Sequence, residues 1–265
     1  MSVWHAIILG IVEGATEFIP ISSSGHLILS HKILNIQGIE SLSVDAIFQS
    51  ATILAVLVYF WSDLCHLFKV FIRMGLRKIV ANEDKIMIQA IIISTIPAVI
   101  IGLYVEKYME TTFRSAHLVA WSLLAGSLLM FLAEKYARQN KILSTGKGFI
   151  IGLFQSLALV PGVSRSGATI SGGLFLGLTR EMATRFSFLL SFPIIVGAGL
   201  KSFMEVYRAG EIASIGSLPL GIGFLVSFTV GLASIHFLIQ YLKTHKLYIF
   251  IWYRIGLAVL ILYFF

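Results

Sequence analysis

Glu13 and Glu17 suggest chemistry most directly in this 265-residue chain, because they are carboxylates inside its apolar N-terminal region. They are four residues apart in the segment EGATEFIPISSSGH, so a helix through them puts both carboxylates on one face. Two neighbouring carboxylates suit a divalent cation such as Mg²⁺ or Ca²⁺, or a proton that the pair shares. Structural pairing inside a helix bundle is the alternative, but ionisable residues at membrane depth favour the functional interpretation.

The same segment continues after Pro20 with hydroxyls, a glycine and an imidazole at the expected start of the next helix: Ser22, Ser23, Ser24, Gly25 and His26. Backbone N–H groups at a helix start bind anions, so this turn is predicted to bind substrate. His26 follows Ser23 by three residues, which makes it a candidate base or acid for that hydroxyl. Helix capping by one of the serines and a histidine without a catalytic role are the alternatives.

A second segment, PGVSRSGAT, repeats this pattern with Ser164, Arg165, Ser166, Gly167 and Thr169. Arg165 takes the place that Ser23 has in the first segment. A planar guanidinium among hydroxyls and backbone amides matches phosphate oxygens, so Arg165 is the predicted anion clamp. The alternative is an ion pair with Glu13 or Glu17, and the two states can alternate with ligand occupancy.

The composition predicts a membrane protein, since 57% of the residues are hydrophobic, only 12% are charged and the mean hydropathy is +0.91. The net charge of +7 comes from Lys and Arg residues scattered between apolar stretches, which favours positive-inside topology over nucleic-acid binding. A single cysteine, Cys65, excludes a disulfide framework and a cysteine-based metal cluster. No signal peptide is expected at the N-terminus.

Six uninterrupted apolar stretches are long enough to cross a bilayer, at about 46–62, 86–105, 116–133, 184–200, 216–239 and 247–265. Two further stretches, Val3 to Val12 and Phe149 to Val160, are each cut by one of the polar segments. Each covers roughly 15 to 18 Å, about half of the hydrocarbon core. We therefore predict an all-α integral membrane protein, a single membrane domain over residues 1–265 with six transmembrane helices and two re-entrant helical hairpins.

Most basic residues fall in four loops, at about 67–85, 134–148, 180–185 and 243–246. The positive-inside rule places these loops in the cytoplasm and both termini outside. Arg254 is expected about one turn from the cytoplasmic end of the last span, where its side chain can reach the interface. A structural role is predicted for it.

An internal repeat at an offset of 142 residues relates Gly10 to Gly152 and Ser22 to Ser164. The copies cover about 1–134 and 147–265, and three predicted spans follow each polar segment. Three crossings reverse the side of the chain, so the second copy is predicted to have inverted topology. Two hairpins that enter from opposite faces then bring both polar segments into one site near the midplane.

At EGATEFIPISSSGH and PGVSRSGATI the chain resembles the undecaprenyl-diphosphatase family of bacterial membrane phosphatases, which is associated with bacitracin resistance. Both family motifs occur in order, and chain length and span count fit from end to end. The resemblance implies release of phosphate from undecaprenyl diphosphate on the outer face of the plasma membrane, which recycles the carrier lipid for wall polymers. It points to seven residues: Glu13, Glu17, Ser23, His26, Ser164, Arg165 and Thr169. One departure lies in the segment Phe48 to Thr52, where the family pattern leads us to expect a glycine near Ala51.

The expected mechanism places the diphosphate between the hairpin tips and involves Glu17, Ser23, His26 and Arg165 as catalytic residues. The expected substrate-binding residues are Ser22, Ser24, Gly25, Ser164, Ser166, Gly167 and Thr169, while Glu13 and Glu17 would hold a divalent cation. Ser23, assisted by His26 or Glu17, is the preferred nucleophile, and water activated by Glu17 is the alternative.

A transporter for the polyprenyl phosphate carrier is the alternative function, since inverted repeats with broken helices are typical of secondary carriers. The expected partners are the polyprenyl diphosphate lipid and the bilayer, without nucleic acid. A homodimer is left open.

Overall fold

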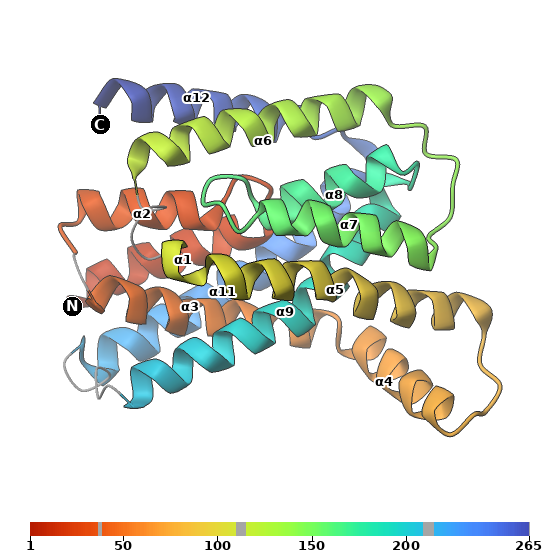
Figure 1. The fold of residues 1–265 in the computed structure, drawn as a ribbon. Helices are drawn as coiled ribbons and strands as arrows, with labels where there is room; N and C mark the ends of the chain where they lie inside the picture. Colours follow the sequence, from red (N-terminus) through yellow and green to blue (C-terminus); the bar gives the residue numbers. More distant parts are fainter. Residues whose placement is uncertain (37–38, 110–114, 209–214, 265) are drawn as a thin grey trace.

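A computed structural model of the chain describes residues 1–36, 39–109, 115–208 and 215–264, which form eleven α-helices and no strand (Figure 1). The helices are α1 (Val3–Phe18), α2 (Ser23–Ile33), α3 (Ile39–Tyr59), α4 (Trp61–Gly75), α5 (Asn82–Met109), α6 (Ala116–Tyr136), α7 (Thr145–Leu157), α8 (Arg165–Phe175), α9 (Arg180–Arg208), α11 (Ser217–Thr244) and α12 (Tyr248–Phe264). The prediction of an all-α protein is confirmed for the described part of the chain.

Within the described ranges, three helices are long and apolar enough to cross a membrane: α5 over Asn82–Val105, α6 and α11. The pair α3 and α4 forms a fourth candidate, with a bend of 78° between its two helices. The apolar helix α12 is shorter, at 17 residues. The chain is therefore a multi-pass membrane protein, and the count of six spans stays a prediction.

The helix α4 covers the start of the region 67–85 that was predicted to be a loop, and α5 begins within that region at Asn82. The predicted loop at 180–185 is the first turn and a half of α9, so the loop prediction was wrong for 67–75, 82–85 and 180–185. The basic residues of α4 suggested a loop, but apolar and basic side chains alternate at helical spacing. Phe68 and Phe71 are both exposed, as is Arg73 on the same helix. An amphipathic helix with exposed apolar residues is typical of the membrane interface.

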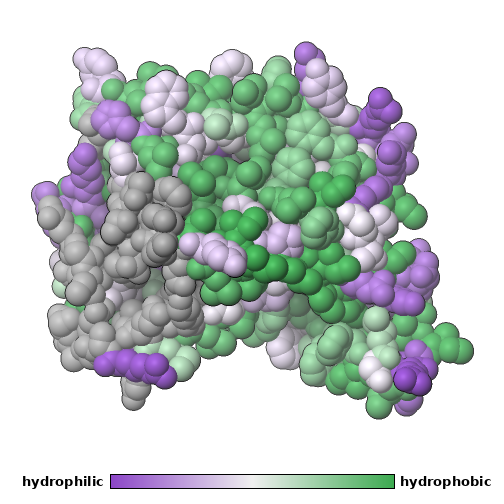
Figure 2. Space-filling view, in the orientation of Figure 1, coloured by the Kyte–Doolittle hydropathy of each residue, from purple (hydrophilic) through white to green (hydrophobic). Residues whose placement is uncertain are grey.

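The outer surface agrees with a position in a bilayer. Apolar residues cover most of the middle of the face in Figure 2, and hydrophilic residues gather toward its left and right ends. Most helices in Figure 1 run between these two ends. Large apolar side chains such as Trp121 and Trp252 are 62% and 70% exposed. Such a surface suits hydrocarbon rather than water.

Small residues let the first helix of each polar segment pack closely against a long helix. On α1, a Cβ added at Gly14 would lie 2.6 Å from the carbonyl oxygen of Ser227 on α11. On α7, a Cβ added at Gly148 would lie 2.8 Å from the Cα of Ala90 on α5. Small residues at such contacts drive helix association in membranes, where the hydrophobic effect between helices is absent.

Both polar segments lie at breaks between two short helices. The helix α1 has 16 residues and α2 has 11, while α7 has 13 and α8 has 11. At 1.5 Å per residue, none of the four crosses a hydrocarbon core of about 30 Å. The first helix continues past the apolar run that ends at Val12 and stops at Phe18, just before Pro20, as the sequence predicted. Glu13 and Glu17 consequently lie on α1 itself.

Candidate active site

The two breaks have the same local backbone conformation. Ser22 has a φ of 77° and Ser164 a φ of 73°, values that residues other than glycine rarely adopt. Each serine precedes an 11-residue helix and accepts a hydrogen bond from the backbone N–H three residues later, of Gly25 at 3.3 Å and of Gly167 at 3.2 Å. Both serines are therefore helix caps, as the alternative interpretation of the serines proposed.

Two contacts join the breaks, although they are about 140 residues apart in the chain. The Ser22 hydroxyl also accepts a hydrogen bond from the backbone N–H of Gly162 at 3.1 Å. Arg165 Nη2 donates to Glu17 Oε1 at 3.1 Å, which forms the ion pair considered as the alternative role of Arg165. The carboxylate of one motif and the guanidinium of the other thus belong to a single site.

A polar pocket of about 240 Å³ lies between the breaks. Its lining includes six of the predicted site residues, namely Glu17, Ser22, Ser23, Ser24, Ser164 and Arg165. The other predicted residues, Glu13, Gly25, His26, Ser166, Gly167 and Thr169, are not among those that line it. Thr169 is 1% exposed, and its hydroxyl bonds to Ser187 Oγ on α9 at 2.5 Å. This contact joins α8 to α9.

Glu17 is central to the hydrogen bonding in this pocket. Its Oε2 accepts a hydrogen bond of 2.5 Å from the Ser23 hydroxyl, and its Oε1 accepts the bond from Arg165. Hydrogen bonds to a carboxylate are short and strong when the partner is charged or the oxygen is ionised. Glu17 is thereby positioned to take a proton from Ser23, while Arg165 orients it.

His26 has different partners from the one that its spacing suggested. Its Nδ1 lies 2.7 Å from the carbonyl oxygen of Ser22, and its Nε2 lies 2.8 Å from the hydroxyl of Tyr253, whose ring stacks on the imidazole. A carbonyl oxygen only accepts, so Nδ1 carries a proton. Among the described residues no hydrogen bond joins His26 to Ser23, because the imidazole points to the capping turn and to α12.

Two buried polar atoms near the site lack a hydrogen-bond partner within the described ranges, Glu13 Oε1 and Arg165 Nη1. Glu13 is 1% exposed. An unsatisfied buried donor or acceptor is costly, so both atoms are suited to a ligand. The donor of Arg165 would suit an anion, and the oxygen of Glu13 a cation.

The carboxylates of Glu13 and Glu17 are the candidate ligands for a divalent cation, either Mg²⁺ or Ca²⁺. The described residues contain no group of three or more His, Cys, Asp or Glu side chains that could hold a metal. Mg²⁺ commonly uses one or two carboxylates together with substrate phosphates, whereas Ca²⁺ takes six to eight oxygens. Glu13 and Glu17 could each supply a carboxylate oxygen to an Mg²⁺ ion whose other ligands come from phosphate and water.

Arg254 differs most from its expected position. It is completely buried rather than extended to the interface, so the prediction was wrong. Its guanidinium donates to Pro20 O at 3.2 Å and to Gly162 O at 2.9 Å, one carbonyl in each break, and to Leu123 O and Ser127 Oγ on α6, each at 3.2 Å. Arg254 thus connects both breaks from outside the pocket, in agreement with a structural role.

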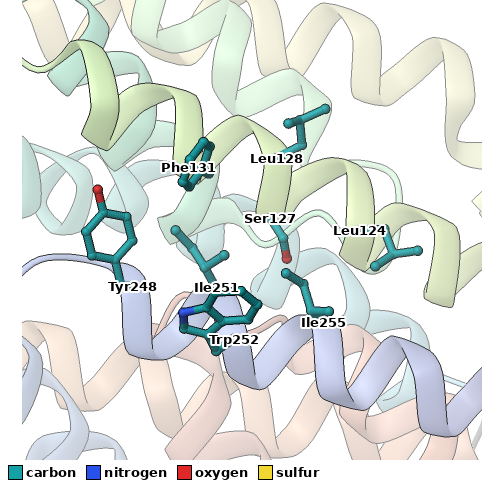
Figure 3. Close-up of a pocket in the computed structure, with 8 residues that line it drawn as sticks. All are labelled: Leu124, Ser127, Leu128, Phe131, Tyr248, Ile251, Trp252 and Ile255. Atoms are coloured by element: carbon teal, nitrogen blue, oxygen red, sulfur yellow. The ribbon is translucent and has the colours of Figure 1, made fainter.

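Among the polar residues that line the pocket, sequence reasoning missed Gln49 on α3 as a candidate site residue. The available signal was a polar amide inside a stretch otherwise apolar enough to span the membrane. The structure also has two apolar grooves whose positions the sequence did not indicate. One lies between α6 and α12, where Phe131, Tyr248 and Trp252 are among the lining residues (Figure 3). The other lies between α3 and α9.

Comparison with known proteins identifies the family of the chain. The family model described as bacitracin resistance protein BacA matches residues 6–260. The chain is 43% identical to an undecaprenyl-diphosphatase of Chloroherpeton thalassium, over 99% of this chain and 96% of the relative. It is 37% identical to an undecaprenyl-diphosphatase of Myxococcus xanthus, over 99% and 89%, and 43% identical to undecaprenyl-diphosphatase 1 of Frankia alni, over 98% and 95%. Since the family model and these relatives cover almost its whole length, the chain belongs to the BacA family of bacitracin resistance proteins.

Proposed function

We propose that this protein hydrolyses undecaprenyl diphosphate to undecaprenyl phosphate and inorganic phosphate. Relatives that match almost the full chain bear the name of this activity. The pocket supports it independently, because it combines a guanidinium, several hydroxyls and a carboxylate that already bonds a serine. The product is the carrier lipid that bacteria reuse for peptidoglycan and other wall polymers.

Substrate binding is assigned to the pocket between the breaks. Arg165 has a buried donor without a partner, and it would bind phosphate oxygens through its planar fork. Ser24 and the starts of α2 and α8 add hydroxyl and backbone N–H donors, with a favourable helix dipole. When the diphosphate enters, Arg165 exchanges part of its contact with Glu17 for the phosphate.

The chemical step is assigned to Ser23 and Glu17. Glu17 takes the hydroxyl proton of Ser23, Ser23 Oγ forms a bond to the terminal phosphorus, and the anhydride P–O bond breaks to release undecaprenyl phosphate. Water then hydrolyses the phosphoserine and yields inorganic phosphate. In the second scheme Glu17 activates a water, which attacks the phosphorus directly, and Ser23 only donates a hydrogen bond.

The contacts favour Glu17 over His26 as the base. Ser23 Oγ bonds Glu17 at 2.5 Å, whereas both ring nitrogens of His26 already have partners. His26 is assigned to support of the capping turn. This role would still make His26 important, because it fixes the backbone that presents Ser23.

Glu13 and Glu17 would hold a divalent cation, with Mg²⁺ preferred by the donor set, and the ion would neutralise charge on the phosphate oxygens when bound. Glu13 contributes the buried oxygen that has no partner among the described residues. Arg165 supplies the positive charge beside Glu17, to which it donates a hydrogen bond of 3.1 Å. The diphosphate would therefore bind next to this ion pair, with Arg165 contacting its oxygens directly.

The proposal includes the topology: six spans, two re-entrant hairpins as inverted repeats, and a site open to the outer side of the bacterial plasma membrane. The matching caps at Ser22 and Ser164 support a repeat. An impermeant thiol reagent added to intact cells should fail to label a cysteine introduced at Lys141. Labelling at this position would show that the protein has the opposite orientation in the membrane. A homodimer is compatible with the proposal and is not required by it.

The single observation that carries the function is the chain of contacts from Ser23 through Glu17 to Arg165. The experiment is phosphate release from undecaprenyl diphosphate by the purified protein in detergent micelles. Because helices that break at a shared site also occur in secondary carriers, transport of the carrier lipid is the second candidate. Micelles have no two sides, so hydrolysis there supports the phosphatase, and its absence under all divalent cations tested would favour the transporter.

A further inference from the structure

An apolar groove of about 370 Å³ runs between α3 and α9, with α11 at one side. Ile53 and Leu57 line it from α3, Phe192 and Val196 from α9, and Phe224 from α11. We propose that this groove binds the isoprenoid tail of the diphosphate substrate. The proposal rests on the proposed function. It gives the isoprenoid tail a binding site, whereas the polar pocket accounts only for the diphosphate.

Continuity between the groove and the polar pocket is the first argument. Gln49 lines the polar pocket, and Ile53, one helical turn further along α3, lines the groove. On α9, Ile195 lines the polar pocket and Gly199, again one turn further, lines the groove. Both helices therefore lead from the polar pocket into the apolar groove in one turn.

The chemistry of the walls is the second argument. The residues that line the groove are apolar, apart from Gly199, which has no side chain, and Ser50. The Ser50 hydroxyl donates to the carbonyl oxygen of Ala46 at 2.9 Å, so it is already paired. A ligand that is charged at one end and hydrocarbon along the rest matches the polar pocket and the groove together.

The groove also has an open side toward the bilayer. Leu54 is 37% exposed and Leu200 is 58% exposed, and both line it. A tail longer than the groove can therefore continue into the lipid without leaving an apolar environment. Only the first isoprenoid units need to contact the protein.

The groove between α6 and α12 is larger, about 470 Å³, but is a weaker candidate (Figure 3). It shares no lining residue and no helix with the polar pocket. A tail in that groove would have to pass between helices to reach the phosphate site. This groove provides a matched control, since it is mainly apolar and Leu128, one of its lining residues, is 59% exposed.

The first test is substitution. Val196→Trp places a bulky ring in the groove between α3 and α9, and Leu128→Trp does the same in the control groove. Initial rates are measured in detergent with undecaprenyl diphosphate and with dimethylallyl diphosphate, which has a single isoprenoid unit. Val196→Trp should lower kcat/KM for the long substrate about tenfold and leave the short substrate within about twofold, while Leu128→Trp changes neither. Equal losses for both substrates, or a selective loss in Leu128→Trp, would overturn the proposal.

The second test does not depend on turnover or on how a variant folds. Farnesyl diphosphate with a diazirine on its terminal isoprenoid unit is photolysed with the unaltered protein, and the labelled residues are identified by mass spectrometry. Labelling should fall on residues 53–57 and 196–200 and decrease with added undecaprenyl diphosphate. Labelling of α6 and α12, or uncompeted labelling over all lipid-facing helices, contradicts the groove. Competed labelling without any phosphate release would instead keep the groove and remove the phosphatase function.

Discussion

The break between α1 and α2 and the break between α7 and α8 have nearly the same backbone but different chemistry. Both contain a serine in the left-handed region that caps a short helix. At the next position, however, the first break has Ser23 and the second has Arg165. The carboxylates also occur only in the first. A similar turn thus presents a serine hydroxyl beside a carboxylate in the first break and a guanidinium in the second.

The breaks also differ in how they are held. Ser22 accepts backbone hydrogen bonds from Gly25 and from Gly162 in the other break, whereas Ser164 accepts only from Gly167 among backbone donors within the described residues. Arg254 donates to a carbonyl in each. The two serines therefore have the same local conformation, but only Ser22 also holds the two breaks together through a backbone hydrogen bond.

The largest expected effect tests the nucleophile. Ser23→Ala should reduce kcat by more than about 10⁴-fold if Ser23 forms the phosphoserine, because the attacking atom is removed. If water attacks, only a hydrogen bond to a charged group is lost, and the reduction should be roughly 10- to 150-fold. Single-turnover phosphate release measures the difference. Ser24→Ala, a neighbouring hydroxyl of the same pocket, is the control and should lose far less.

The carboxylates of the first break come next. Glu17→Gln should lower kcat by about 10²- to 10⁴-fold, since it removes the general base, and Glu13→Gln should cost less. Glu13→Gln should instead raise the Mg²⁺ concentration needed for half-maximal rate. Identical Mg²⁺ titrations in the parent protein and in both variants would exclude the pair from cation binding.

Arg165→Lys tests the anion clamp of the second break by keeping the charge and removing the planar fork. A loss of about 10²-fold in kcat/KM is expected, with Arg165→Ala worse, because bidentate contact with phosphate oxygens is lost. Thermal unfolding in detergent should change little by comparison. Near-normal turnover in Arg165→Lys would reduce the residue to a structural partner of Glu17.

Arg254→Met tests the connection between the breaks. The substitution leaves the carbonyls of Pro20 and Gly162 without this donor, and a loss of roughly 2 to 3 kcal/mol in stability is expected. The measurement is thermal inactivation in detergent, with Arg254→Lys as the variant that keeps the charge. An unchanged inactivation temperature in Arg254→Met would show that the breaks are held by other contacts.

The smallest effect compares the caps directly. Ser164→Ala should destabilise the protein by about 1 kcal/mol, the usual value for a lost cap. Ser22→Ala should destabilise the protein more, because the Ser22 hydroxyl accepts a second hydrogen bond, from the N–H of Gly162, that is lost as well. Equal shifts in thermal unfolding would mean that the contact between the breaks contributes nothing to stability.

The sequence alone determined the membrane class, the all-helical fold and the two polar segments, because hydropathy and helix-breaking residues act locally. It also identified every charged residue that lines the pocket, Glu17 and Arg165. A carboxylate or guanidinium at membrane depth is energetically costly, so a charged residue within an apolar stretch can be recognised from the sequence as functionally important. The capping role of Ser22 and Ser164 was likewise available, as an alternative, from position within the motif.

Only the tertiary structure decided which of these residues meet. Spacing of three residues suggested His26 for Ser23, but the turn before α2 directs the imidazole to Tyr253 and leaves Ser23 to Glu17 on the preceding helix. Proximity to a span end suggested an extended Arg254, but its carbonyl partners come from segments more than ninety residues away. Local periodicity reports which face a residue occupies, whereas the partner across that face is set by the packing of distant helices.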